Sequence, residues 1–114
     1  MRRMNELPNF EAIQIDKAKI TEYLLSSTNQ EGKAGFFTRF GFSVAEWEML
    51  AEAMRHQLAN HEVTQVIQNR HGTKFLIEGV LTTPDGRNPV VRSVWLIETG
   101  KQVARLITAY PVKG

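Results

Sequence analysis

The chain has 114 residues, the size of one ordinary globular domain with one hydrophobic core. It contains no cysteine, which excludes disulfide frameworks, thiolate catalysis and cysteine-based metal sites. The formal net charge is +2, but residues 1–62 carry seven Lys or Arg against nine Asp or Glu, whereas residues 63–114 carry seven against three. This split either favours an anionic partner such as nucleic acid at one face or is an ordinary asymmetry of a small domain.

The beginning of the chain predicts neither secretion nor membrane insertion. Arg2 and Arg3 are followed by polar residues instead of the apolar run of a signal peptide. Nothing approaches the roughly 18 consecutive apolar residues of a membrane-spanning helix. We therefore expect a cytoplasmic protein without membrane contact. His56 and His61 are five residues apart and lack further ligands nearby, so we expect no metal, and no cofactor-binding motif is present.

The acidic first half is predicted to be mainly helical. Residues 5–15 are predicted to be extended, with a short edge strand as an alternative. A helix over about 17–26 follows. A polar loop at 26–29 precedes a second, short helix over 31–40. Gly41 stands where a helix often ends in a left-handed residue. The inward residues of the first helix are predicted to be Ile20, Tyr23 and Leu24.

A third and longer helix begins after a capping box formed by Ser43 and Glu46. Its apolar stripe follows helical spacing and consists of Trp47, Leu50, Ala51, Met54 and Leu58. Its opposite face is expected to be solvated and carries Glu48, Glu52, Arg55 and Gln57. His56 and His61 lie at the carboxyl end, where the helix dipole favours them.

After Asn60 the apolar period changes from helical to two, and short turn signals separate four segments. The predicted strands are Val63–Asn69, Thr73–Leu81, Pro89–Glu98 and Gln102–Tyr110. Such short links favour an antiparallel meander. The predicted fold class is α+β, with about three N-terminal helices packed on one face of a four-stranded antiparallel sheet. The chain is then a single domain over 1–114, with 1–62 mainly helical and 63–114 mainly strands.

The predicted strands hold the polar residues that could do chemistry. His71 is either a general acid or base, the role for which histidine is the usual residue, or an exposed turn residue. Arg92 stands among valines, where a charge is costly unless solvated or paired, so it either binds phosphate or pairs with Glu78. Lys74 and Arg105 are further anion ligands.

Alternation sorts these residues by sheet face. It places Lys74 and Glu78 on one face of the second strand, and Arg92 opposite Ser93 on the third. In the fourth strand it predicts that Thr108 and Tyr110 point away from Arg105. Thr108 and Tyr110 could orient a phosphate or a base, although strands favour both residue types.

Five motifs taken together resemble a bacterial domain-of-unknown-function family whose members have about this length. The motifs are Leu7-Pro8-Asn9, His71-Gly72-Thr73-Lys74, Thr83-Pro84-Asp85-Gly86, Val91-Arg92-Ser93-Val94-Trp95 and Arg105-Leu106-Ile107-Thr108-Ala109-Tyr110-Pro111. Members of that family also end larger secreted proteins or stand beside a gene for a small β-rich protein. The resemblance therefore implies a toxin with a small cognate antitoxin-like partner.

The predicted architecture is also similar to the barnase–EndoU–colicin–RelE class of metal-independent ribonucleases. That resemblance implies RNA as substrate, His71 or Lys74 in proton transfer, and Arg92 with Arg105 as phosphate ligands. It implies Tyr110 and Thr108 as positioning groups. The chain lacks the paired histidines of the EndoU type and, apart from Glu78, a barnase-like glutamate. The candidate catalytic residues are His71, Lys74, Arg92 and Tyr110, and the candidate substrate-binding residues are Arg105 and Thr108.

The leading hypothesis is a small bacterial toxin, a metal-independent ribonuclease neutralised by a cognate antitoxin protein. The runner-up is a non-catalytic protein-binding module of antitoxin or immunity type. A third hypothesis is an RNA-binding domain without chemistry. The RNA target and the oligomeric state stay open.

Overall fold

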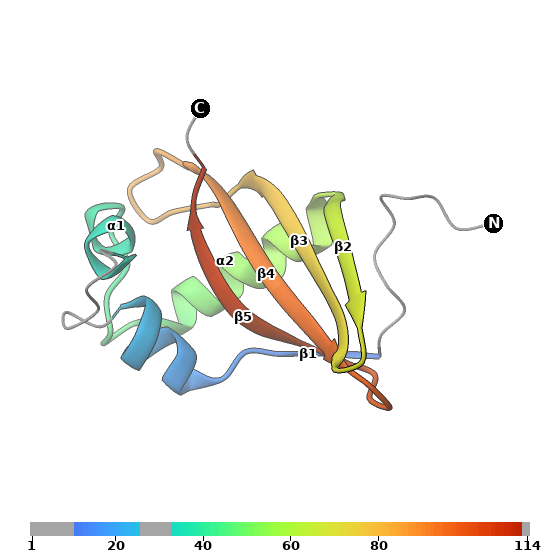
Figure 1. The fold of residues 1–114 in the computed structure, drawn as a ribbon. Helices are drawn as coiled ribbons and strands as arrows, with labels where there is room; N and C mark the ends of the chain where they lie inside the picture. Colours follow the sequence, from blue (N-terminus) through green and yellow to red (C-terminus); the bar gives the residue numbers. More distant parts are fainter. Residues whose placement is uncertain (1–10, 26–32, 113–114) are drawn as a thin grey trace.

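The central layer of the domain is a five-stranded sheet with the strand order β1-β5-β4-β3-β2 (Figure 1). The computed structural model describes residues 11–25 and 33–112. The strands are β1 (Ala12–Gln14), β2 (Val63–Asn69), β3 (Gly72–Val80), β4 (Val90–Glu98) and β5 (Val103–Pro111). Strands β2 to β5 form the antiparallel meander that alternation in the second half of the sequence predicts.

Strand β1 corrects the predicted fold class. The prediction of a four-stranded antiparallel sheet is wrong, because β1 pairs with β5 in the parallel direction, with Ile13 opposite Ala104. The sheet is therefore mixed. A strand of three residues is too short for its own alternation to reveal its pairing partner. The part of the predicted lead-in before residue 11 lies outside the described residues.

The prediction of three helices on one face of the sheet is also wrong. Among the described residues only α2 (Trp47–Asn60) runs along the sheet, behind it in Figure 1. The π-helical segment η1 (Lys19–Leu24) lies beside β5, and α1 (Lys33–Arg39) packs against η1. Helix length explains why α2 runs along the sheet and α1 does not, because at 1.5 Å per residue α2 is roughly 21 Å long and α1 roughly 10 Å. The predicted loop at 26–29 and residues 31–32 lie outside the described residues.

Of the predicted signals at two helix ends, the one after α1 is confirmed. Gly41 adopts a φ of 101° just after α1, and its N–H donates to the Thr38 carbonyl at 3.0 Å. Before α2, the N–H of Glu46 donates to Ser43 Oγ at 3.3 Å, but the predicted capping box does not start the helix, because α2 begins at Trp47 with Glu46 as its N-cap and without a side-chain cap bond. These local bonds fix where the chain enters and leaves the short connection between the two helices.

The hydrophobic core lies between α2 and the sheet. The predicted stripe is confirmed for four of its residues, which are buried: Leu50, Ala51, Met54 and Leu58. Trp47 is only half-buried and packs at the rim of the core. The sheet contributes the large buried side chains Phe75, Ile77, Trp95 and Leu106. Burying each such side chain contributes about 1.5–3 kcal/mol, so this layer contact dominates the stability of the domain.

Gln57 corrects the predicted solvated face of α2, because its side chain is 0% exposed. Its Nε2 donates to the Gly79 carbonyl at 3.0 Å and to the Val91 carbonyl at 2.8 Å. Its Oε1 accepts a bond from Ser93 Oγ at 2.7 Å, and Ser93 Oγ accepts one from Trp95 Nε1 at 2.9 Å. All polar atoms of this buried network are satisfied, so Gln57 joins α2 to β3 and β4 at little desolvation cost.

Gly79 allows the chain after α2 to lie close to β3. A Cβ atom at Gly79 would lie 2.6 Å from Cγ of the His61 ring. His61 is the first residue beyond α2, and its half-buried ring occupies the space that a side chain at position 79 would need. The sequence predicts His61 near the end of the helix but not this contact with the sheet.

The predicted turn after β3 is confirmed. The Gly86 N–H donates to the Thr83 carbonyl at 3.0 Å, and Gly86 has a φ of 80°. The backbone N–H of Arg87 donates to Asp85 Oδ1 at 3.0 Å. This bond is the main cause that lowers the pKa of Asp85, with further bonds from Arg87 and Thr83 side chains. The turn therefore orders the connection between β3 and β4.

We predict that Gln57→Leu destabilises the domain by about 1–3 kcal/mol, because the Gly79 and Val91 carbonyls and the Ser93 hydroxyl lose a buried partner. Urea unfolding measures this change. The matched control is Gln65→Leu on exposed β2, which should change the free energy of unfolding by less than about 0.5 kcal/mol. Equal effects of the two substitutions would contradict a bracing role for Gln57.

We predict that Gly79→Ala also destabilises the domain, by about 1–3 kcal/mol, because the added methyl group overlaps the His61 ring. The same substitution in a His61→Ala background should cost about 1 kcal/mol less, which a double-mutant cycle of urea unfolding measures. If Gly79→Ala costs the same in both backgrounds, the contact with His61 is not the reason for the glycine.

Candidate functional site

The candidate site lies on the face of the sheet that points away from α2, which we call the open face. Figure 1 shows this face toward the viewer, with no described helix lying across it. Cross-strand register aligns its side chains in rows that run across β3, β4 and β5. The three rows are Glu78–Arg92–Tyr110, Leu76–Val94–Thr108 and Lys74–Leu96–Arg105.

A β-bulge in β5 brings Arg105 to this face. Uninterrupted alternation predicts Arg105 on the side opposite Thr108 and Tyr110, and this prediction is wrong. Leu106 pairs with Trp95 but Thr108 pairs with Val94, so the register shifts by one residue between them. The extra residue reverses the alternation along β5. The residues of β5 that point into the core are consequently Ala104, Leu106 and Ala109.

The first row, Glu78–Arg92–Tyr110, is the most strongly connected, and we call it the Arg92 row. Arg92 Nη2 donates to Glu78 Oε2 at 2.7 Å, and Arg92 Nε donates to the same oxygen at 3.1 Å. On the other side, the Arg92 guanidinium carbon lies 5.8 Å from the centre of the Tyr110 ring. Hydrogen bonds with Glu78 and then with Tyr110 raise the pKa of Arg92. The predicted Arg92–Glu78 pairing is therefore confirmed, and the arginine stays charged.

Glu78 keeps an acceptor oxygen toward the open face. Both bonds from Arg92 end on Oε2, and within residues 11–25 and 33–112 no hydrogen bond or ion pair reaches Oε1. The Glu78 side chain is 29% exposed, so a molecule on the open face can reach it. Oε1 is therefore an acceptor that a donor group of a bound molecule can reach.

The third row holds two further cations, Lys74 and Arg105. Arg105 Nη2 pairs with Glu98 Oε1 at 2.9 Å, and Lys101 Nζ lies 3.5 Å from Glu98 Oε2. Lys74 is half-buried beside Leu96, and no acidic side chain of the described residues pairs with it. Lys74 and Arg105 lie four and about five residues along their strands from the Arg92 row, roughly 13 Å at about 3.3 Å per residue.

Thr108, in the middle row, contacts a residue from the first half of the chain. Its Oγ1 lies 3.5 Å from the hydroxyl oxygen of Tyr23, which is part of η1. The sequence predicts Tyr23 as an inward-facing helical residue and provides no signal for this contact, because it depends on how η1 docks beside β5. Tyr23 is therefore a site residue that the sequence does not reveal.

His71 lies apart from the other predicted residues. It is exposed in the turn between β2 and β3, where its N–H donates to Asn69 Oδ1 at 2.8 Å. His71 precedes Glu78 by seven residues, which is on the order of 20 Å along β3. The structure thus brings together Arg92, Tyr110 and Thr108, places Lys74 and Arg105 further along the same face, and leaves His71 at the edge.

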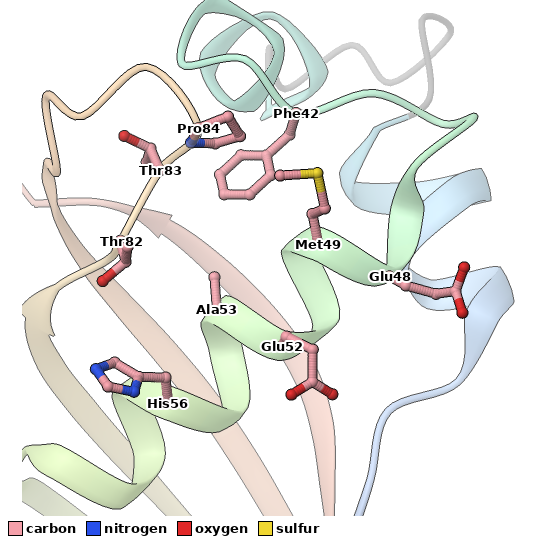
Figure 2. A pocket seen from close by; sticks show the side chains of 9 residues that line it. All are labelled: Phe42, Glu48, Met49, Glu52, Ala53, His56, Thr82, Thr83 and Pro84. Carbon is pink, nitrogen blue, oxygen red and sulfur yellow. The ribbon is translucent and has the colours of Figure 1, made fainter.

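Two hollows lie elsewhere on the molecule. A groove of about 600 Å³ lies between α2 and the loop after β3, on the helix side of the sheet (Figure 2). Figure 2 shows Phe42, Met49 and Pro84 gathered at one end of the groove and His56 at the other. A polar hollow of about 500 Å³ lies among the turns near Asn69 and Lys101. None of the six predicted site residues lines either hollow.

Across the described part of the chain, no three His, Asp or Glu side chains gather as metal ligands. No helix in that part is long and apolar enough to cross a membrane. The Arg92 row instead offers a fixed cation, a carboxylate acceptor and a phenol side by side on adjacent strands. This combination suits the binding of a phosphodiester and proton transfer to and from its oxygens.

Comparison with known proteins identifies the family of the chain. No curated protein matches the chain. A chain of the solved contact-dependent growth inhibition toxin–immunity protein complex from Klebsiella pneumoniae 342 has a similar fold, with a TM-score of 0.68 and 18% sequence identity. The similarity covers 86% of this chain and 98% of that chain, and at this identity it establishes the fold alone. Residues 6–113 match the model of a domain of unknown function, DUF6883. The chain therefore belongs to the DUF6883 family.

Proposed function

We propose that the chain is the toxin of a toxin–immunity pair and that it cleaves RNA without a metal ion. The observation that carries this proposal is the Arg92 row, which combines an acceptor, a cation and a phenol on a sheet face that no described helix covers. The fold adds support, because a similar chain occurs in a complex of a toxin with an immunity protein. We further propose that the protein acts in the bacterial cytoplasm, where RNA is available, and that a small immunity protein neutralises it.

The proposed reaction is a transesterification within RNA. Glu78 Oε1 accepts the proton of a ribose 2′-hydroxyl, and the 2′-oxygen forms a bond to the adjacent phosphorus. Arg92 donates hydrogen bonds to the non-bridging oxygens as negative charge develops on them. The Tyr110 hydroxyl donates its proton to the leaving 5′-oxygen as the phosphorus–oxygen bond breaks. The products are a 2′,3′-cyclic phosphate and a free 5′-hydroxyl.

The remaining predicted residues have binding roles in this proposal. Lys74 and Arg105 lie further along the open face and bind phosphates upstream or downstream of the cleaved bond. Thr108 lies between them and the Arg92 row and orients the ribose or base. His71 is assigned no proton transfer, because it lies on the order of 20 Å from Glu78 along the strand.

We predict that Arg92→Ala and Glu78→Gln each lower the rate of RNA cleavage by about 10²–10³-fold, because each removes a group that acts on the reacting atoms. Cleavage of a labelled RNA by purified protein in the presence of a chelator measures the effect. Growth of bacteria that express each variant provides a second readout. The expected products carry cyclic phosphate ends.

Two controls belong to this experiment. Glu52→Gln removes a carboxylate that also pairs with an arginine, Arg55, but on the exposed side of α2, and it should leave cleavage unchanged. His71→Ala should lower the rate by no more than about threefold, since His71 is remote from the Arg92 row. If wild-type protein neither cleaves RNA nor arrests growth, the enzyme proposal fails and an immunity-type binding role takes its place.

A further inference from the structure

The segment η1 borders the candidate site. Tyr23 of η1 lies with its hydroxyl oxygen 3.5 Å from Thr108 Oγ1, on the middle row of the open face. Thr108 precedes Tyr110 by two residues, roughly 7 Å along β5 at about 3.3 Å per residue. The phenol of Tyr23 therefore stands within about one nucleotide of the Arg92 row, although 87 residues separate it from Tyr110 in the sequence.

The position of Tyr23 is fixed by the packing of η1. Ile20 and Leu24, which flank Tyr23 in this short segment, are both 0% exposed in the core. The Leu25 N–H donates to the Ile20 carbonyl at 2.8 Å, the five-residue spacing of a π-helix. Widened helical turns of this kind occur often at functional sites. The anchors hold η1 against β5, and the partly buried Tyr23 ring packs against the core.

A lysine of η1 adds a positive charge at this border of the candidate site. Lys19 Nζ lies 4.8 Å from the centre of the Tyr23 ring, and its side chain is half-buried. The ammonium group lies over the Tyr23 ring, and the hydroxyl of that ring reaches Thr108 on the open face. Lys17, two residues earlier, contacts a different ring, that of Trp47, at 5.6 Å. The two lysines carry the same charge, but Lys17 is exposed, Lys19 is half-buried, and they contact different aromatic residues.

We propose that Lys19 and Tyr23 bind the RNA strand beside the cleaved bond, with Lys19 contacting a phosphate and Tyr23 holding the neighbouring nucleotide against Thr108. This inference rests on the proposed ribonuclease function and extends it to the first half of the chain. Lys19 and Tyr23 bind substrate and take no part in proton transfer. Loss of either group therefore raises KM and leaves kcat nearly unchanged.

The salt dependence of RNA binding tests the role of Lys19 directly. Binding is measured by titrating a single-stranded RNA oligonucleotide into the full chain with Glu78→Gln, so that the RNA stays intact. Each phosphate contact contributes about 0.7 to the slope of log K against log salt concentration for a single strand. Lys19→Gln should lower the magnitude of this slope by about 0.7, whereas Lys19→Arg should retain it. The matched control, Lys17→Gln, removes the same charge two residues before η1 and should leave the slope unchanged.

Tyr23→Phe tests the hydroxyl separately, because it keeps the ring beneath Lys19 and removes only the oxygen near Thr108. In the protein with Glu78 intact, it should raise KM for RNA cleavage about three- to tenfold without changing the salt slope. A fall in kcat with an unchanged KM would overturn the binding role.

The outcomes separate this inference from the proposed function. If the chain with an intact Arg92 row neither binds nor cleaves RNA, the proposed function fails and this inference fails with it. If RNA is cleaved and Arg92→Ala abolishes cleavage, but Lys19→Gln and Lys17→Gln give equal slopes, only the proposed binding of RNA by η1 is refuted. A lowered slope for Lys19→Gln alone supports it.

Discussion

The amide of Gln57 joins the two layers of the domain at the place where the candidate site stands on the other side of the sheet. Its Nε2 bonds to the carbonyls of Gly79 and Val91. These residues directly follow Glu78 and directly precede Arg92, so the amide holds β3 and β4 from behind the Arg92 row. A buried polar group with every atom satisfied specifies one arrangement of neighbours, whereas apolar packing tolerates several. The geometry of the row therefore depends on a core residue that no substrate can touch.

The open face carries apolar side chains although no described helix covers it. Leu76 and Val94 sit side by side in the middle row and are only 8% and 6% exposed. The rows on either side carry long charged residues, whose aliphatic stems can cover these two side chains while their charged ends stay in water. The two bonds to Glu78 limit the rotamers of Arg92 before any substrate binds. A cation that is already oriented loses less conformational entropy when it binds a phosphate.

The sequence predicted the faces of β3 and β4 because alternation is uninterrupted in both strands. In β4, Arg92 stands among valines, and its charge must be solvated or paired. It could not predict the face of Arg105, since the bulge near Ile107 is set by pairing with β4 and leaves no mark in the residue types. Gln57 was misassigned for a related reason, because a polar residue in a helix reads as solvated unless its buried partners are known. The pairing of β1, the docking of η1 and the distance between His71 and Arg92 likewise depend on contacts between remote segments.

The sequence left open whether Arg92 pairs with Glu78 or binds phosphate, and the geometry makes these roles compatible. A guanidinium carries five N–H donors, and Glu78 accepts bonds from only two of its nitrogens on a single oxygen. The other donor nitrogen, Nη1, takes no part in the pair with Glu78, so a phosphate can bind Arg92 without breaking that pair. The pair then has a function in the free protein, because it aligns the guanidinium beside the Glu78 carboxylate. A phosphodiester that binds to Arg92 is placed beside the carboxylate by the same bonds that hold the row together.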